Sequence, residues 1–180
     1  MVPDQQWIVE ANQAERSEIR DELRQIGRMM WEDLDPLNSR FWVCRDGVRR
    51  IAWVGLEMDG AKALLRSLYT APQHRKLGIG RRLVQTAEDQ AAALGANEVY
   101  LFSTGAGGFF QSLGYVEVPV SEAVAALRHT PQVLWYLARP DLLSAEVTFC
   151  KVVGPNRPLQ PTRAAPSNGQ WEPAGSGPRG

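Results

Sequence analysis

The sequence predicts an α/β domain of the α+β kind, with a central, mixed but mainly antiparallel twisted sheet of about six or seven strands flanked by about four or five helices. Two Asp-Gly turn signals, at residues 46–47 and 59–60, separate three β-prone segments. Both links are too short for a helical crossover, so these segments form an antiparallel meander. Beyond residue 78 apolar residues recur at helical spacing, and strand-like and helix-like segments then alternate.

The first half of the chain is expected to hold four strands and one helix. Residues 7–12 are β-prone, and residues 15–26 carry apolar side chains at helical spacing. Gly27 ends this helix, because glycine readily adopts the left-handed conformation found at helix C-termini. The strands of the meander are expected at 41–44, 49–58 and 62–69.

The second half is expected to begin with an amphipathic helix that starts near Gly78 and stops at Gly95, since its apolar residues share one face. The elements after it are expected as a strand at 98–103, a short helix at 108–113, a strand at 115–118, a helix at 121–129 and a last strand at 147–152.

The chain is expected to divide into one folded domain, residues 1–153, and a disordered Pro/Gly-rich tail, residues 154–180. The tail holds six of the 12 prolines and only two large apolar side chains, too few to offset the entropy of ordering it. The whole chain has 20 basic and 20 acidic residues. Three arginines and one glutamate give the tail +2, which leaves −2 on the domain.

This charge balance argues against nucleic acid and membranes as partners, because no global positive field would attract them. No apolar run approaches the ~20 residues that span a bilayer, and the N-terminus lacks the pattern of a secretory signal. The expected location is therefore the cytoplasm. Cys44 and Cys150 are expected to be buried thiols, and the sequence predicts no metal site.

The most informative stretch is residues 64–84, which reads LLRSLYTAPQHRKLGIGRRLV. A strand leads into a basic loop that opens directly into the amphipathic helix. Gly78 and Gly80 remove side chains from the start of that helix, whose free amides and partial positive charge suit a pyrophosphate. The loop is neither a P-loop, which needs GxxxxGK[ST], nor a dinucleotide fingerprint, whose third glycine is replaced by Leu83.

The pattern [RQ]-x-x-G-x-[GA] at residues 75–80, after a strand and Pro72, resembles the acetyl-CoA loop of the GNAT superfamily of N-acetyltransferases. VYLFS and FFQSLGY follow in the family's order, so the resemblance covers about residues 7–153. The segments LLRSLYTAP and FSTGAGGFFQSLGYVEVP are similar to a subgroup of arsenic-resistance and amino-acid N-acetyltransferases.

The resemblance implies a GNAT-type fold and an acyltransferase that moves the acetyl group of acetyl-CoA to the primary amine of a small molecule. An amino acid or a toxic amino-acid analogue is the implied acceptor, with direct attack in a ternary complex, no metal, and a homodimer as a common assembly. The backbone of Leu68 and Thr70 would bind the pantetheine arm. The residues implied to hold the pyrophosphate are Arg75, Lys76, Gly78, Gly80 and Arg81.

The sequence does not decide which residue accepts the proton of the amine or whether any residue protonates the leaving thiolate. Glu57 is the first candidate for the general base, and a cross-strand ion pair with Lys62 is its equal alternative. Further candidates for the base are Glu117, Glu122, His74 and His129. Many relatives have a tyrosine in the short helix that protonates the leaving thiolate, but this chain has Phe110. The alternative function is therefore a non-catalytic CoA-binding or regulatory module.

Arg66 is a charged residue in an otherwise apolar strand, and such a cation needs a partner. It is a candidate anchor for the carboxylate or arsenical anion of an acceptor, and an ion pair with an acidic side chain of the same sheet is the alternative. The stretch 121–136 is expected to wall the acceptor pocket with Trp135 and Tyr136, for which plain core packing is the alternative.

Overall fold

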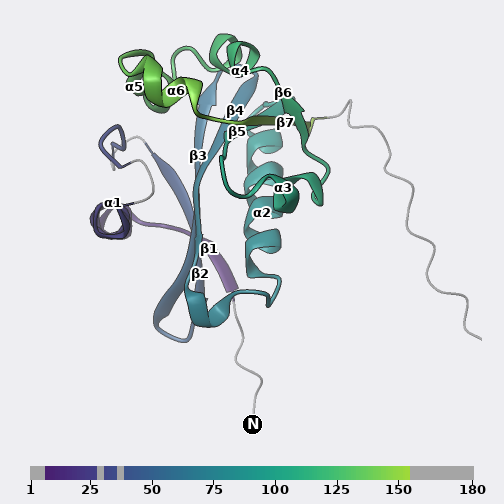
Figure 1. Cartoon of the computed structure of the whole chain (residues 1–180). Coiled ribbons are helices and arrows are strands. Elements are labelled where there is room, and N and C mark those ends of the chain that lie inside the picture. The colour runs from purple at the N-terminus through teal and green to yellow at the C-terminus, as the bar shows by residue number, and fades with distance from the viewer. Residues whose placement is uncertain (1–6, 28–30, 36–38, 155–180) are drawn as a thin grey trace, which may run out of the picture.

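A seven-stranded sheet runs through the computed structural model, which describes residues 7–27, 31–35 and 39–154 (Figure 1). In chain order the elements are β1 (Trp7–Glu10), α1 (Gln13–Ile26), β2 (Arg40–Asp46), β3 (Arg49–Asp59), β4 (Lys62–Thr70), the 3₁₀ turn η1 (Pro72–His74), α2 (Ile79–Ala93), β5 (Glu98–Phe102), α3 (Gly107–Gln111), β6 (Val116–Val118), α4 (Val120–Ala126), α5 (Pro131–Leu137), α6 (Pro140–Ser144) and β7 (Thr148–Val152).

The strand order is β1-β2-β3-β4-β5-β7-β6. Every neighbouring pair is antiparallel except β4 and β5, which are parallel. The predicted fold class is confirmed, and each predicted helix or strand matches an observed one to within about three residues at either end. The β4–β5 crossover contains α2, as a parallel connection requires.

Two helices, α5 and α6, were not predicted. Each has a proline in its first turn, where the missing N–H would lack an intrahelical partner in any case. The predicted helix at 121–129 ends earlier, at Ala126, and the chain between it and β7 folds into these two short helices. The described residues thus form six α-helices, one more than the upper expectation.

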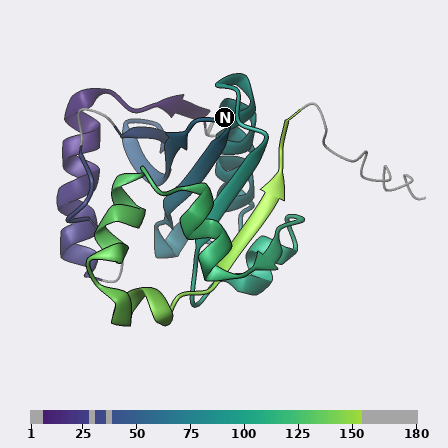
Figure 2. The same ribbon diagram turned by 90° about the horizontal axis from the view of Figure 1, so that it is seen from above.

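Helices cover both faces of the sheet (Figure 2). Successive residues of a strand point to opposite faces, so apolar residues next to each other in a strand pack against helices on different sides. In β3, Trp53 packs with Ile19 and Leu23 of α1 on one face. The next residue, Val54, packs against α2 on the other face. Helices α4 and α5 cover the α1 face farther along, where Leu127 and its neighbours pack on β4, β5 and β7.

Helix α1 shows how local sequence sets an element's limits. The side chain of Asn12 accepts a hydrogen bond from the N–H of Glu15, and the Glu15 carboxylate accepts one from the N–H of Asn12, both at 3.0 Å. This capping box starts the helix. Gly27, with φ of +66°, ends it in the left-handed conformation, as predicted.

Both cysteines are buried free thiols, as predicted. The last strand ends at Val152, and the predicted tail lies outside the described residues except for Gly154. None of the helices in the described ranges is long and apolar enough to cross a bilayer.

Candidate active site

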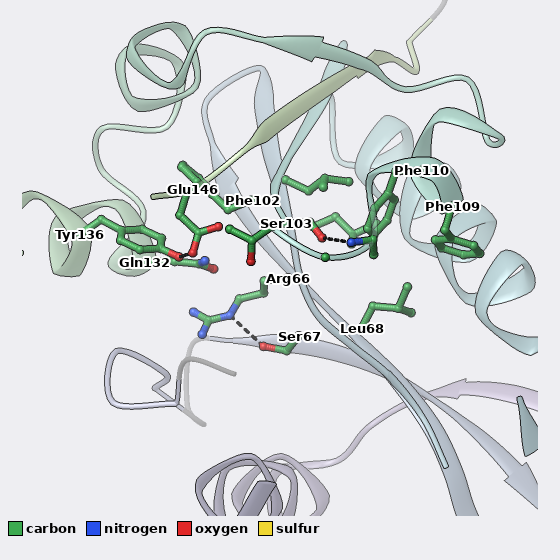
Figure 3. A pocket seen from close by; sticks show the side chains of 15 residues that line it. Arg66, Ser67, Leu68, Phe102, Ser103, Phe109, Phe110, Gln132, Tyr136 and Glu146 are labelled. Atoms are coloured by element: carbon green, nitrogen blue, oxygen red, sulfur yellow. Dashed lines mark hydrogen bonds between the residues drawn. The ribbon is translucent and has the colours of Figure 1, made fainter. Parts of the chain in front are cut away.

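β4 and β5 pair only where they begin and then diverge. Residues 62–64 pair with residues 98–100, after which β4 pairs only with β3, and β5 only with β7. The divergence opens a cavity of about 510 Å³, lined by both strands, by the loop that follows β5, and by α3 and α5 (Figure 3). A break in a sheet with open strand edges is a place where a ligand can bind backbone groups.

A bulge in β4 lies at the point of divergence. Arg66 pairs with Gly55 and Tyr69 pairs with Trp53, so β4 has one residue more than β3 across this interval. Ser67 has a φ of +54°, which is uncommon for a residue other than glycine. The bulge re-aims the rest of β4 along the cavity.

Beyond the bulge, the edge of β4 that faces away from β3 is formed by Leu68 and Thr70, and Nε of Arg75 donates to the carbonyl of Thr70 at 3.0 Å. The N–H of Ala71 donates to the carbonyl of Ile51 next to β3, at 2.9 Å. Backbone groups alternate in direction along an antiparallel strand, so those of Leu68 and Thr70 point away from β3 and into the opening. These are the two residues implied to bind the pantetheine arm, a role that stays a prediction.

The loop after β4 brings the N-terminus of α2 to the same opening. Gly78 adopts a φ of +79° there, and within the described chain no side chain caps the helix. A Cβ on Gly80 would lie 3.8 Å from Oγ1 of Thr70 and 3.5 Å from the ring of Phe109. The first amides of α2 are therefore accessible to an anion. The exposed basic side chains around them belong to Arg75, Lys76 and Arg81.

Arg66 lies at the cavity with its guanidinium in a buried acidic cluster. Nη1 donates to Oε1 of Glu57 at 2.6 Å, and Nη2 donates to Oδ1 of Asp33 at 3.0 Å. Nη1 also bonds Oδ2 of Asp33, and Nε bonds Oγ of Ser67 at 3.3 Å. The side chains of Arg66, Asp33 and Glu57 are only 1%, 2% and 7% exposed.

The protonation of this cluster follows from its burial and its charges. Burial opposes the charge on Arg66, but the carboxylates of Glu57 and Asp33 outweigh it and raise the pKa of Arg66. Burial also raises the pKa of Glu57, although Arg66 pulls it down. Arg66 is therefore a permanent cation whose charge is already compensated.

A separate carboxylate, that of Glu146, lines the cavity at the same end as Arg66 (Figure 3). The hydroxyl of Tyr136, in α5, donates to Oε1 of Glu146 at 2.6 Å, and Figure 3 shows the carboxylate lying between Tyr136 and Ser103. Burial and this bond raise the pKa of Tyr136, so the phenol stays neutral. The N–H of Ser103 donates to the carbonyl of Val147, the residue after Glu146, at 2.8 Å, which holds the backbone next to Glu146 against the end of β5.

The segment 31–35 joins α5 at this end of the cavity. Nε1 of Trp135 donates to Oε2 of Glu32 at 2.9 Å, and the guanidinium of Arg139 lies 3.9 Å from the centre of the Trp135 ring. Asp33, the residue after Glu32, forms an ion pair with Arg66. One short segment therefore links the buried cluster beneath the cavity to the helix that walls it.

Comparisons with known proteins agree with this geometry. Residues 37–117 match the family model of the acetyltransferase (GNAT) domain. An uncharacterized N-acetyltransferase of Chlorobaculum tepidum is 36% identical over 73 residues, which are 41% of this chain and 42% of that protein. The matched segment is therefore similar to a GNAT acetyltransferase domain over residues 37–117. The chain matches less than half the length of this curated relative.

Solved structures share the fold of this chain at low sequence identity. N-acetylglutamate synthase of Neisseria gonorrhoeae, solved with coenzyme A and N-acetyl-glutamate, aligns at a TM-score of 0.61 and 14% identity over 82% of this chain and 35% of that one. Rv2747 of Mycobacterium tuberculosis, solved with CoA and NLQ, aligns at 0.63 and 15% over 81% and 98%. A Staphylococcus aureus acetyltransferase of the GNAT family aligns at 0.59 and 16% over 83% and 99%.

The structure pairs Glu57 and Arg66 with each other, which bears on the alternatives left open for both residues. The predicted pairing of Glu57 with Lys62 is wrong: Glu57 lies opposite Leu64, and Lys62 bonds the carboxylate of Glu98. The hairpin turns at Gly60 and the residue after it, so the register differs by two residues from the predicted one. Glu57 instead bonds Arg66, the ion pair weighed as the alternative for that arginine.

The other candidate bases lie away from the cavity. Glu117 and Glu122 are exposed on β6 and α4. The ring of His129 bonds Asp59 at 3.0 Å, with 67% of its side chain exposed. His74 is half-buried in η1. Neither these four residues nor Glu57 lines the cavity between β4 and β5.

Sequence reasoning missed the acidic and amide side chains at or beside the end of the cavity that α5 walls: Asp33, Gln132 and Glu146. The Thr-Pro pair at residues 130–131 is a helix-start signal that could have revealed α5. Nothing local could have placed Glu146 beside Tyr136, because that contact depends on how α6 returns the chain to the sheet. In the described ranges no group of three His, Cys, Asp or Glu side chains is arranged to hold a metal.

Proposed function

We propose that this chain is an N-acetyltransferase that moves the acetyl group of acetyl-CoA to the primary amine of a small molecule. The observation that carries the proposal is the diverging β4–β5 pair, which joins a helix N-terminus with accessible amides to a cavity of about 510 Å³. Solved GNAT relatives contain CoA, which supports acetyl-CoA as the cosubstrate.

Different residues along this opening would bind different parts of acetyl-CoA. The amides at the start of α2, with Arg75, Lys76 and Arg81, would hold the pyrophosphate. The backbone edge at Leu68 and Thr70, whose Thr70 carbonyl already accepts a bond from Arg75, would bind the pantetheine arm as an added strand does. Acetyl-CoA supplies the thioester carbonyl that the amine attacks, and the N–H of Leu68 would stabilise the developing oxyanion.

The leaving thiolate needs no protein acid. Phe110 lines the cavity and packs edge-on against Phe109 and Tyr115, so its position is apolar. A thiol has an ordinary pKa of about 8.5, and its thiolate can therefore leave and take a proton from water or from the nitrogen that has attacked and become positively charged. Phe110 thus favours direct attack without general acid catalysis by that helix.

The acceptor predicted from sequence is an amino acid or a toxic, arsenical analogue, with Arg66 as the anchor of its anionic group. N-acetyl-glutamate in the Neisseria relative supports this class. The anchor role requires Arg66 to bind a further anion while it holds Asp33 and Glu57. Location in the cytoplasm and assembly as a homodimer likewise remain proposals.

Two measurements test the proposal. Calorimetric titration with acetyl-CoA is expected to show one site per chain, and thiol release is expected with at least one member of a panel of amino acids, amines and arsenical analogues. Binding without thiol release from any acceptor would instead support the alternative, a non-catalytic CoA-binding module. Absence of binding would contradict both.

A further inference from the structure

We call the end of the cavity lined by Arg66, Tyr136 and Glu146 the acceptor end. It carries an excess of negative charge. Arg66 is its cation, and Asp33 and Glu57 already engage that guanidinium. Glu146 lies across the cavity and is bonded by a neutral phenol, not by a cation. Among the described side chains that line this end or bond Arg66, one cation therefore stands against three carboxyl groups.

Glu146 is the carboxylate that faces the cavity. Glu57 does not line it, and its Oε1 is held by Arg66 at 2.6 Å. Glu146 does line it, beside Ser103 at the end of β5, where that strand diverges from β4 (Figure 3). The bond from Tyr136 occupies Oε1 and fixes the orientation of the carboxylate.

We propose that Glu146, oriented by Tyr136, binds the ammonium group of the acceptor and takes its proton, and that the preferred acceptors are primary amines with no carboxylate beside the amine. This rests on the proposed N-acetyltransferase function, and it replaces the amino-acid acceptor predicted from sequence by another acceptor class. Tyr136 is a positioning residue, because it acts through Glu146.

The transfer of the acetyl group releases one proton in total. Glu146 takes one proton from the ammonium, which leaves a neutral amine with its electron pair. That pair forms the C–N bond with the thioester carbonyl, and the C–S bond breaks as the thiolate leaves. The second ammonium proton goes to the thiolate, and Glu146 returns its proton to water. The products are the amide, the free thiol and one proton.

Charge around the cavity disfavours an amino acid. Its carboxylate would lie close to Glu146, since the two groups flank the same amine, and like charges there repel. Arg66 could bind that carboxylate only by loosening its bonds to Asp33 or Glu57. Either change would leave a buried carboxyl group without its partner, which is strongly unfavourable.

Pairs of acceptors that differ by one carboxylate beside their single amine test this directly: 2-methylpropylamine against L-valine, and 2-phenylethylamine against L-phenylalanine. The amine without the carboxylate is expected to have a kcat/KM at least about tenfold higher in each pair. A preference for the amino acid in both pairs would overturn the inference.

Substitutions of Glu146 and Tyr136 provide the second test. Glu146→Gln keeps the size of the side chain and is expected to lower kcat/KM for 1,5-diaminopentane about 100-fold or more. Tyr136→Phe is expected to give a smaller loss, mainly in kcat. The matched control is Asp141→Asn on α6, an exposed carboxylate outside the cavity, which is expected to behave as wild type. A Glu146→Gln enzyme within about twofold of the control would overturn the inference.

A binding measurement keeps the two proposals apart. Wild-type protein saturated with CoA is titrated with 1,5-diaminopentane, and Glu146→Gln is expected to weaken that binding about tenfold or more. Equal binding to both proteins, or none to either, would overturn the inference about Glu146. If the wild type also binds acetyl-CoA and acetylates the amino acids, the proposed N-acetyltransferase function stands without it.

Discussion

Arg66 and Asp33 lie 33 positions apart in the chain and form two hydrogen bonds beneath the cavity, with both side chains almost fully buried. The pair connects the bulged strand β4 to the segment between α1 and β2. Because Arg66 also holds Glu57, one guanidinium fixes the position of two carboxyl groups from different elements.

Asp33→Asn is expected to lower the free energy of unfolding by about 3–5 kcal/mol, because it leaves the buried Arg66 with only part of its compensation. Urea unfolding checks this. Glu10→Gln is the matched control: it breaks an ion pair with Arg40 whose side chains are 45% and 33% exposed, and its expected loss is below about 1 kcal/mol. Equal losses in the two variants would contradict the buried-pair account.

The sequence was sufficient for the elements whose signals are local. Turn residues place the meander, helical spacing places α1 and α2, and the glycines of the loop mark the helix N-terminus. The acceptor end was not predictable in this way. Asp33, Arg66 and Glu146 come from segments far apart in the chain, and their contacts depend on the β4 bulge at Ser67 and on the path through α6.

The register of the β3–β4 hairpin shows the same limit. An Asp-Gly pair predicts a two-residue turn, and reading residues 59–60 as its centre sets Glu57 against Lys62. The observed turn is centred one residue later, with Asp59 and Lys62 paired. A shift of one residue in the turn moves each cross-strand partner by two residues. Glu57 therefore lies opposite Leu64 and not opposite Lys62, and its carboxylate forms an ion pair with Arg66.

Gly55→Ala is expected to destabilise the fold by about 1–3 kcal/mol through overpacking. A Cβ there would lie 2.8 Å and 2.9 Å from the ring of Phe41 and 3.0 Å from Cγ of Arg66. Gly108→Ala, at a site with nothing within 4 Å of the added atom, is the matched control and is expected to leave stability unchanged or raise it by up to about 1 kcal/mol. Thermal unfolding compares the two, and a tolerated Gly55→Ala would contradict this packing.

Gly78→Ala is expected to weaken acetyl-CoA binding about fivefold to tenfold. Its φ of +79° disfavours any side chain by about 1–2 kcal/mol, so the loop would relax and move the first amides of α2. Calorimetric titration measures the change. Gly60→Ala imposes a similar strain, at φ of +58°, in the distant β3–β4 turn and is expected to lower stability without changing the Kd. Equal effects of both variants on the Kd would argue against the pyrophosphate loop.

The ion pair between Lys62 and Glu98 is expected to make stability depend on pH. The hydrogen bond from Lys62 is the main cause that lowers the pKa of Glu98, and Tyr100 adds to it. A carboxyl group with a lowered pKa in the folded state stabilises fully above its ordinary pKa of about 4.3, and the stabilisation is lost as the pH falls through the lowered value.

Glu98→Gln is therefore expected to unfold about 0.5–1 kcal/mol more easily than wild type at neutral pH, and the difference is expected to vanish in acid. Urea unfolding at a series of pH values measures it. Glu117→Gln, an exposed change on β6, serves as the control and is expected to follow wild type throughout. A Glu98→Gln deficit that stays constant with pH would show that lost hydrogen bonding, not lost charge, is its cause.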